Sequence, residues 1–395
     1  MCAPSQGAVH KAANFPGRGF ANPGDCAGNV ARACTASAGI LSAVDIQENV
    51  PLAPLTTFQV GGPARYFVEA QSEPDVRAAV EHAGSRSLPL FVLGGGSNLV
   101  VADSGFPGLV LKIALTGVNE VRQKGKVIFE VGAGEDWDSF VARAVAEECA
   151  GLECLSGIPG TVGGTPVQNV GAYGQEVKDT ITSVRALELV GGEVKELSNA
   201  ECGFRYRGTM FNTTARGRYI VLRVTFMLAS GGKPHLAYAD LKSYFAGWPN
   251  PPTLSETREA VRRIRLRKAM LIVPGDDDCR SAGSFFKNPV VSQEKCAEVE
   301  AAAARLGQTL PKWPAEGNRV KIPAAWLVEH AGFRKGFTRG PVGISRKHAL
   351  AIVNRGNARA ADIVALKNEV QKKVIGEFGI ELVPEPVFVG FETGG

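Results

Sequence analysis

The stretch Ser281–Pro289, with the sequence Ser-Ala-Gly-Ser-Phe-Phe-Lys-Asn-Pro, combines residue types that suit a pocket for a polar ligand. The hydroxyl of Ser284 lies between Gly283 and two phenylalanines, and a lysine and the amide of Asn288 follow. Small residues let a ligand approach closely, aromatic rings form an apolar wall, and polar groups fix the orientation of the ligand. A tight turn that packs Phe285 and Phe286 into the core has the same composition, so this stretch alone leaves both interpretations open.

A glycine-rich loop at residues 94–99 is a candidate site for a phosphate group. It follows a short apolar run, Leu88–Leu93, and its glycines let backbone N–H groups come close to a phosphate. The loop is not a dinucleotide fingerprint, because Leu99 stands where the motif G-x-G-x-x-G needs its third glycine. It is not a P-loop either, because no Gly-Lys-Ser/Thr follows.

A second glycine-rich stretch, Gly157–Gly174, contains too many glycines and prolines for a regular helix or strand. Thr161, Thr165, Gln168 and Asn169 place hydrogen-bonding side chains among its small residues. It is either a long Ω-type surface loop or a functional loop, since long loops in compact domains usually carry function. Together with the first loop it could clamp an extended ligand, such as a dinucleotide, from two sides.

Two groups of cations are candidates for binding an anionic ligand. In Phe204–Arg207 two arginines flank an aromatic residue; in a cleft one would clamp a carboxylate, and on a surface strand both would face solvent. The segment Arg258–Lys268 holds six basic residues and one acidic residue. It is either a solvated basic helix or a helix whose Arg265 and Lys268, one turn apart, face an anionic substrate.

Glu385 is an acidic residue in an otherwise apolar C-terminal run, Leu-Val-Pro-Glu-Pro-Val-Phe. A carboxylate is unusual in a buried strand. The residue is therefore either a charge on an edge strand or a functional acid.

Strand and helix patterns alternate along the rest of the chain, and these elements would position the residues above. Helical spacing of apolar residues predicts helices over Glu73–Ala83, Trp137–Glu148, Arg258–Lys268, Gln293–Leu306, Pro323–Ala331 and Ala360–Phe378, with another opening at Leu236–Leu241. Apolar runs predict strands over Leu88–Leu93, Leu109–Ile113, Val127–Val131, Val184–Val190, Tyr219–Leu228, Ala349–Val353 and Ile380–Val389. Such interleaving predicts an α+β or α/β chain.

The composition excludes several classes of protein. The chain has 395 residues, of which 45% are hydrophobic and 21% charged, as in ordinary globular proteins of two or three domains. A net charge of +5 argues against a wholesale nucleic-acid binder, and no apolar run reaches the roughly 18 residues that span a bilayer. The eight cysteines form no C-x-x-C pair and no zinc-like spacing with the five histidines, so we expect reduced thiols and no metal site.

Residues 1–47 differ in composition from the rest of the chain. Gly, Ala, Pro and Ser dominate, no helical or strand period is present, and no acidic residue precedes Asp25. The segment lacks the long apolar region of a secretory signal. We expect a disordered extension or a wrongly assigned start, with an organelle transit segment as the alternative, and a globular chain that begins near Pro51.

Five segments occur in the order found in one enzyme family: Gly94–Leu99, Ile158–Gly174, Tyr206–Arg207, Ala282–Pro289 and Pro384–Gly390. Each segment is modest evidence, but five in order are specific. Over residues 51–391 the chain resembles the UDP-N-acetylenolpyruvoylglucosamine reductases, also called UDP-N-acetylmuramate dehydrogenases, of bacterial peptidoglycan synthesis.

The resemblance implies an α+β fold with two domains. An FAD-binding domain of the vanillyl-alcohol-oxidase (PCMH) type would cover residues 48–231, and a mixed α/β substrate-binding domain would cover residues 232–395. The final strand would return toward the flavin. The family has forms with and without an extra loop that carries a substrate tyrosine, and Tyr238, in Leu-Ala-Tyr-Ala-Asp-Leu, resembles the form with the loop.

FAD would lie in the crevice, with its diphosphate at the first glycine loop and its ring system near the second. The implied cofactor-binding residues are Arg65, Gly94, Gly95, Gly96, Ser97, Asn98, Leu99, Ile158, Gly160, Thr161, Gly164, Thr165, Gln168, Asn169, Gly171, Ala172, Tyr173 and Gly174. We expect non-covalent FAD, because His82, on a predicted helix, is the only histidine or cysteine between Arg65 and Leu99.

The resemblance also implies the chemistry of an FAD-dependent oxidoreductase. NADPH would reduce the flavin and leave, and UDP-N-acetylglucosamine enolpyruvate would enter the same pocket. Flavin N5 would then give hydride to C3 of the enolpyruvyl group. Arg207 would stabilise the developing negative charge, Glu385 would act as a protonated acid or an orienting partner, and Ser284 would donate a proton to C2.

The implied substrate-binding residues are Tyr206, Tyr238, Arg265, Lys268 and Asn288. Lys268, Asn288 and Tyr238 would hold the nucleotide diphosphate. The expected partners are NADPH and the enolpyruvyl nucleotide, with no nucleic acid and no membrane, for a monomeric cytoplasmic enzyme.

Two alternatives remain at this stage. A related FAD-dependent oxidase that uses oxygen would share the glycine loops but not the Ser284 stretch. A non-catalytic flavin-binding protein would keep the glycines and would not need Ser284, Arg207 and Glu385 together.

Overall fold

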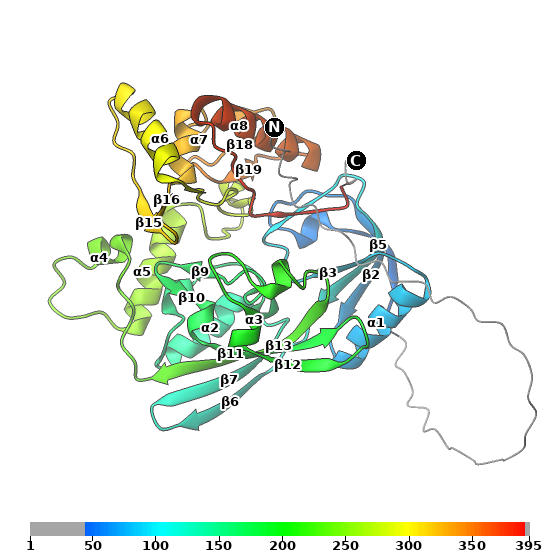
Figure 1. Cartoon of the computed structure of the whole chain (residues 1–395). Helices are drawn as coiled ribbons and strands as arrows, with labels where there is room; N and C mark the ends of the chain where they lie inside the picture. Colours follow the sequence, from blue (N-terminus) through cyan, green and yellow to red (C-terminus); the bar gives the residue numbers. More distant parts are fainter. Residues whose placement is uncertain (1–43, 392–395) are drawn as a thin grey trace, which may run out of the picture.

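The computed structural model describes residues 44–391 (Figure 1). The first part of this chain forms a four-stranded sheet. Its strands run in the order β1-β2-β5-β3, with β1 antiparallel to β2 and the other pairs parallel. They are β1 (Gln47–Pro51), β2 (Pro63–Ala70), β3 (Leu90–Leu93) and β5 (Phe106–Ile113). Helix α1 (Glu73–Ser85) packs on this sheet, and a capping box between Ser72 and Asp75 begins it.

The predicted N-terminal tail, residues 1–47, lies outside the described residues except at its end, where β1 begins at Gln47.

A second, antiparallel sheet follows, with the order β12-β11-β13-β7-β6. Its strands are β6 (Val118–Gln123), β7 (Lys126–Gly132), β11 (Ile181–Glu188), β12 (Val194–Ser198) and β13 (Tyr219–Ser230), and the short β8 (Cys149–Ala150) pairs with the end of β13. The edge strands β6 and β12 are charged and mostly exposed, so they lack the apolar runs that predicted the central strands.

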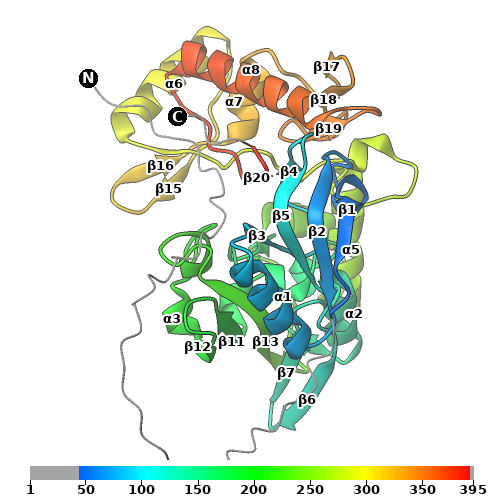
Figure 2. The same ribbon diagram turned by 90° about the vertical axis from the view of Figure 1, so that its right-hand side faces the viewer.

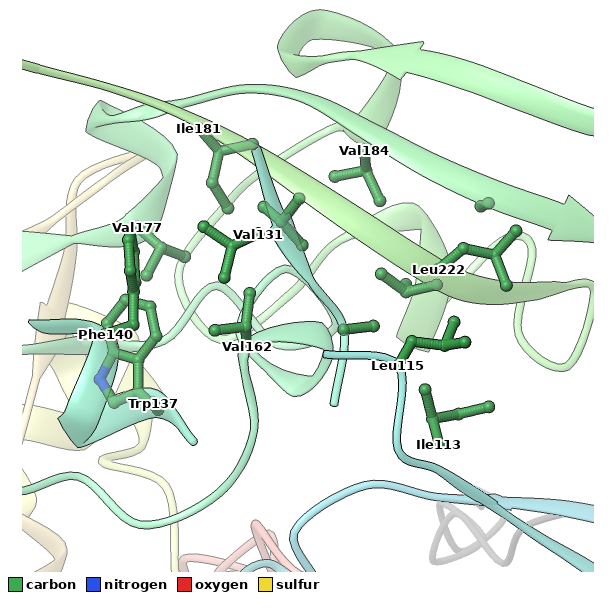
Figure 3. Packing of buried hydrophobic residues seen from close by; sticks show 14 of the residues in the cluster. Ile113, Leu115, Val131, Trp137, Phe140, Val162, Val177, Ile181, Val184 and Leu222 are labelled. Atoms are coloured by element: carbon green, nitrogen blue, oxygen red, sulfur yellow. The ribbon is translucent and has the colours of Figure 1, made fainter. Parts of the chain in front are cut away.

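The core of this part lies between the sheets and helix α2 (Trp137–Ala146), as Figure 3 shows. Trp137 and Phe140 of α2 pack against Phe226 of β13, with ring centroids 6.0 and 5.1 Å apart respectively. Val162, at the start of the second glycine-rich stretch, is fully buried in the same cluster. That stretch is therefore attached to the core at its N-terminal side.

Between the second sheet and the C-terminal part lie α4 (Ala239–Tyr244) and α5 (Leu254–Arg267), after the short elements α3 (Asn199–Cys202), β9 (Gly171–Ala172) and β10 (Gln175–Glu176). Thr253 begins α5 through a capping box with Glu256. α4 packs on α5 through a small apolar cluster that includes Leu241, Phe245, Val261 and Ile264.

The C-terminal part forms a separate layer on one side of the two sheets (Figures 1 and 2). It contains α6 (Gln293–Arg305), α7 (Ala324–His330) and α8 (Ala360–Phe378), with two small sheets built from β14 (Val290–Val291), β15 (Trp313–Ala315) and β16 (Arg319–Lys321), and from β17 (Thr338–Arg339), β18 (Val342–Ile344) and β19 (Ile352–Asn354). In α8, Ile363, Leu366, Val370 and Val374 recur at helical spacing and are buried in one core.

The last strand, β20 (Val387–Val389), pairs in parallel with β4 (Leu99–Val101), which directly follows the first glycine loop. Figure 2 shows the two strands side by side where the C-terminal layer meets the first sheet. The predicted strand Ile380–Val389 is thus regular only at its end, because the two prolines around Glu385 cannot donate ladder hydrogen bonds.

Five cysteines lie in the described part of the chain, and all five are free and buried. Within residues 44–391, no helix is long and apolar enough to cross a bilayer, and no cluster of His, Cys, Asp or Glu could hold a metal ion.

Candidate active site

A cavity of about 620 Å³ runs between the two glycine-rich stretches and the C-terminal layer. Its volume is typical of a site for a small molecule or cofactor. One end is lined by apolar residues of the first sheet, such as Phe91 and Ile113, and the other by the Ser284 stretch. Both parts of the chain therefore contribute walls to one site.

The first glycine loop forms a cradle in which side chains have no room. A Cβ on Gly96, whose φ is +65°, would collide with the carbonyl of Leu55, and a Cβ on Gly95 would lie 2.5 Å from Cα of Gly160 in the second stretch. Ser97 Oγ donates to the carbonyl of Pro159 at 3.0 Å. The two stretches therefore meet closely at the cavity, and a glycine loop of this kind suits a phosphate group.

Gly157, where the second stretch begins, is held from two sides. Its N–H donates to Asp138 Oδ1 of α2 at 2.6 Å, and its carbonyl accepts from Arg265 Nε of α5 at 3.1 Å. Its φ is +72°, and a Cβ would lie 2.4 Å from a methyl group of Leu271. Glycine is therefore required here, and the entry into the loop is fixed by the partly buried Asp138 and the buried Arg265.

Asp138 of α2 binds two arginines of the basic helix α5. Arg258 donates two hydrogen bonds to its carboxylate, at 2.5 and 3.0 Å, and Arg262 also pairs with it. Burial would raise the pKa of Asp138, but the hydrogen bonds from Arg258 and Gly157 and the charge of Arg262 bring that pKa below its ordinary value. Part of the positive charge of α5 therefore holds protein structure.

Arg265 has the same kind of role. Its side chain is 93% buried, its Nη2 donates to the carbonyl of Met270 at 2.6 Å, and burial lowers the pKa of its guanidinium. Arg265 lines the cavity, as predicted for a substrate contact, but its hydrogen bonds go to the two backbone segments that frame the cavity.

The Ser284 stretch and the Glu385 segment are joined by backbone hydrogen bonds. The amide of Glu385 donates to the carbonyl of Phe285 at 2.8 Å, and the amide of Lys287 donates to the carbonyl of Val383 at 2.9 Å. Phe285 and Phe286 are fully buried, so they do pack in the core. Ser284 precedes them, lines the cavity and forms no hydrogen bond within residues 44–391.

Arg207 faces Glu385 across the cavity, with Arg207 Nε 3.7 Å from Glu385 Oε2. Nε of Arg207 is buried and has no hydrogen-bond partner among the described residues, which suits an anionic ligand. Burial raises the pKa of Glu385, and the charges of Arg207 and Lys287 oppose this rise. The side chain of Glu385 is only 16% exposed, so its carboxyl group holds a proton more readily than that of an exposed glutamate.

Lys268 lies near two tyrosines at the opposite wall. Its Nζ is 2.5 Å from Asp240 Oδ2 and 6.0 Å from the ring centroid of Tyr173. The rings of Tyr173 and Tyr238 meet edge to face at 5.5 Å, and burial raises the pKa of Tyr173 to about 12. The phenol of Tyr173 therefore stays neutral at physiological pH and can donate a hydrogen bond.

Most of the predicted site residues line this cavity. They are Gly94, Gly95, Gly96, Ser97, Asn98, Leu99, Ile158, Gly160, Thr161, Gly164, Thr165, Gln168, Gly171, Ala172, Tyr173, Arg207, Tyr238, Arg265, Lys268, Ser284 and Glu385.

Three residues predicted to bind the cofactor lie outside the lining. Arg65 is exposed on β2, with its guanidinium 5.1 Å from the ring centroid of Tyr66. The amide nitrogen of Asn169 is bound to Glu176 at 2.8 Å, so this buried side chain supports the second stretch. Gly174 lies against His235, beyond the cavity wall.

Two residues predicted to bind the substrate also lie outside the lining but beside residues that form it. Asn288 accepts from the backbone N–H of Ala324, the first residue of α7, at 2.9 Å, which leaves its own amide hydrogens available. Tyr206 is 47% exposed and packs 5.2 Å from the ammonium group of Lys321.

Sequence analysis missed several polar residues of the lining, among them Thr57, Lys287 and His348. His348 Nδ1 accepts from the backbone N–H of Leu350 at 3.1 Å, and burial together with the charges of Lys268 and Lys335 lowers the pKa of His348 to about 4. The ring is therefore neutral, with its hydrogen on Nε2. Nothing in the sequence around His348 singled it out, whereas Lys287 lies within the stretch Ser281–Pro289 and was noted there without a role of its own.

Comparisons with known proteins found family models that match both parts of the chain. A family model for an FAD binding domain matches residues 64–198, and one for the C-terminal domain of UDP-N-acetylenolpyruvoylglucosamine reductase matches residues 274–389. Together the two models confirm the prediction of an FAD-binding domain followed by the C-terminal domain of this family.

Similar whole proteins carry the same name. The UDP-N-acetylenolpyruvoylglucosamine reductase of Streptomyces coelicolor is 47% identical over 89% of this chain and 92% of the relative, and that of Thermobifida fusca is 46% identical over 87% and 97%. The crystal structure of the reductase from Thermus caldophilus is 27% identical, covers 88% of this chain and 98% of that one, and superposes with a TM-score of 0.59. The chain belongs to the UDP-N-acetylenolpyruvoylglucosamine reductase family.

Proposed function

We propose that this protein reduces UDP-N-acetylglucosamine enolpyruvate to UDP-N-acetylmuramate with FAD and NADPH, in peptidoglycan synthesis. The observation that carries the proposal is the meeting of Arg207, Ser284 and Glu385 at one cavity, next to two glycine-rich stretches, in a member of this family. An oxidase or a passive flavin-binding protein would not need this group of residues.

The cavity fits FAD without a covalent bond. The cradle at Gly94–Gly96 suits the diphosphate, and the second stretch, held at Gly157, suits the ring system. When bound, FAD supplies the redox chemistry that passes reducing equivalents from NADPH to the enolpyruvyl double bond.

Three side chains act on the substrate. Arg207 stabilises the negative charge that develops on the carboxylate side of the enolpyruvyl group, and its unpartnered Nε supplies a donor. Burial raises the pKa of Glu385, and Glu385 orients the carboxylate of the enolpyruvyl group through Arg207. Ser284, whose hydroxyl is free of protein partners within residues 44–391, donates the proton to C2.

The nucleotide is held by the opposite wall. Lys268 and Tyr238 bind the diphosphate, with Tyr238 in the role of the substrate tyrosine of the form that has the extra loop. Asn288 and Tyr206 contact the part of the nucleotide that extends beyond the cavity lining, because the amide hydrogens of Asn288 are available and Tyr206 is half exposed.

The wider roles follow from this reaction. A peptidoglycan precursor supports the cell wall, and hence cell shape and division. Both the nucleotide substrate and NADPH are cytoplasmic metabolites, so we place the enzyme in the cytoplasm. We also propose that it acts as a monomer.

The test is NADPH consumption by the purified yellow protein. We expect rapid oxidation of NADPH only when the enolpyruvyl nucleotide is present, with flavin released on denaturation. Equal consumption with oxygen alone would identify an oxidase, and no consumption under either condition would identify a flavin-binding protein.

A further inference from the structure

Lys268, the cation that faces the proposed diphosphate site, is already paired with a carboxylate of its own chain. Asp240 Oδ2 lies 2.5 Å from Lys268 Nζ, and the two side chains are 36% and 39% exposed. Lys268 lines the cavity, whereas Asp240 does not. Building on the proposed function, we propose that Asp240 competes with the substrate diphosphate for Lys268 and so limits the affinity of the site for nucleotides.

Asp240 is held in this position by the fold. It lies in the first turn of α4, which packs on α5 through Leu241 and Ile264, and α5 ends next to Lys268. The chain just before α4 is tied down at His235, whose N–H donates to buried Glu153 at 2.7 Å. The carboxylate therefore stays close to Lys268 when a ligand arrives.

The other groups around Lys268 do not replace Asp240. Lys268 Nζ lies over the ring of Tyr173, 6.0 Å from its centroid, and His348 is neutral because its pKa is lowered to about 4. Lys335 adds positive charge near His348. Asp240 is thus the carboxylate paired with Lys268 among the described residues, and a diphosphate that reaches Lys268 meets a like charge at close range.

Limited affinity has a use in this reaction. Substrate and product carry the same UDP group, so contacts with the diphosphate bind both equally. Binding that is uniform along the reaction does not raise kcat, and it slows release of the product. A carboxylate that weakens the Lys268 contact allows the product to leave.

The experiment measures UDP binding to FAD-loaded enzyme by titration calorimetry. Asp240→Asn should bind UDP about two- to fivefold more tightly than wild type, the range set by partly exposed ion pairs. The matched control is Glu259→Gln, which removes the same charge from an exposed pair with Arg263 on α5 and should leave binding unchanged. In a Lys268→Ala background, Asp240→Asn should give no gain, because the competition needs both partners.

Flavin absorbance verifies that each variant is loaded and folded, and Asp240→Ser gives a second test of the same change. Weaker UDP binding by both Asp240 variants would overturn the proposal and make Asp240 the residue that orients Lys268. An equal gain in Glu259→Gln, or a gain that persists without Lys268, would also overturn it. If wild type binds no UDP at all, the proposed function itself fails, which separates the two failures.

Discussion

At the scale of single residues, Glu385 lowers the stability of the folded protein when its carboxyl group is ionised. Glu385 is a buried carboxyl that faces Arg207 at 3.7 Å, and its pKa is nevertheless raised, because burial outweighs the attraction. A raised pKa means that the folded chain binds the proton more tightly than the unfolded chain. Stability from this group is therefore lost as the pH rises from about 4.5, the ordinary value, through the folded pKa.

Replacing this carboxyl should separate stability from activity. Glu385→Gln should raise Tm at pH 8 by about 2 °C and lower turnover, and the gain in Tm should vanish below pH 4.5, where both forms are neutral. Calorimetric scans over pH measure this, with the exposed Glu377→Gln on α8 as the control. An unchanged or lower Tm at pH 8 would show that Arg207 stabilises the ionised carboxylate more than burial destabilises it.

At the scale of elements, the structure assigns the basic helix α5 two tasks that its sequence could not separate. Arg258, Arg262 and Arg265 point into the FAD-binding part and hold Asp138 and Gly157, whereas Lys268 ends the helix at the cavity. Helical spacing predicted that Arg265 and Lys268 share a face. It could not predict that the carbonyl of Gly157, more than one hundred residues away, would be there to accept from Arg265.

Some helices could be predicted from the sequence alone, and some strands could not. Apolar spacing predicted the long helices, because that signal is local. The mostly exposed strands β6 and β12 were missed, since their pairing depends on neighbours distant in sequence. The composition of the two glycine-rich stretches was enough to identify them. The backbone hydrogen bond between Phe285 and Glu385, which brings Ser284 close to Glu385, has no signal in the local sequence.

The hydrogen bond from Arg265 to Gly157 should affect the affinity of the protein for FAD. Arg265→Lys keeps the charge but cannot reach both Gly157 and Met270, so we expect FAD to bind about tenfold more weakly, roughly the loss of one charged hydrogen bond. Arg267→Lys, on the exposed side of the same helix, should bind FAD as wild type does. Flavin fluorescence during titration of apoprotein gives both constants, and equal affinities would remove Arg265 from the support of the loop.

At the scale of the whole molecule, two parts of the chain line the cavity and have different functions. The FAD-binding part supplies the glycine cradle and Arg207, and the C-terminal part supplies Ser284 and Glu385 through paired backbone segments. The pairing of β20 with β4 holds the end of the chain against the first glycine loop. The central claim is that flavin reduction depends on the first part alone, whereas substrate reduction needs the second part as well.

Stopped-flow absorbance of Ser284→Ala tests this claim most directly, because both half-reactions can be followed on one sample. Reduction of the flavin by NADPH involves no proton delivery to C2, so its rate and the FAD content should match wild type. Reoxidation by the enolpyruvyl nucleotide should slow at least roughly hundredfold, the loss typical of a missing general acid. Equal slowing of both half-reactions, or slowing of neither, would contradict the claim.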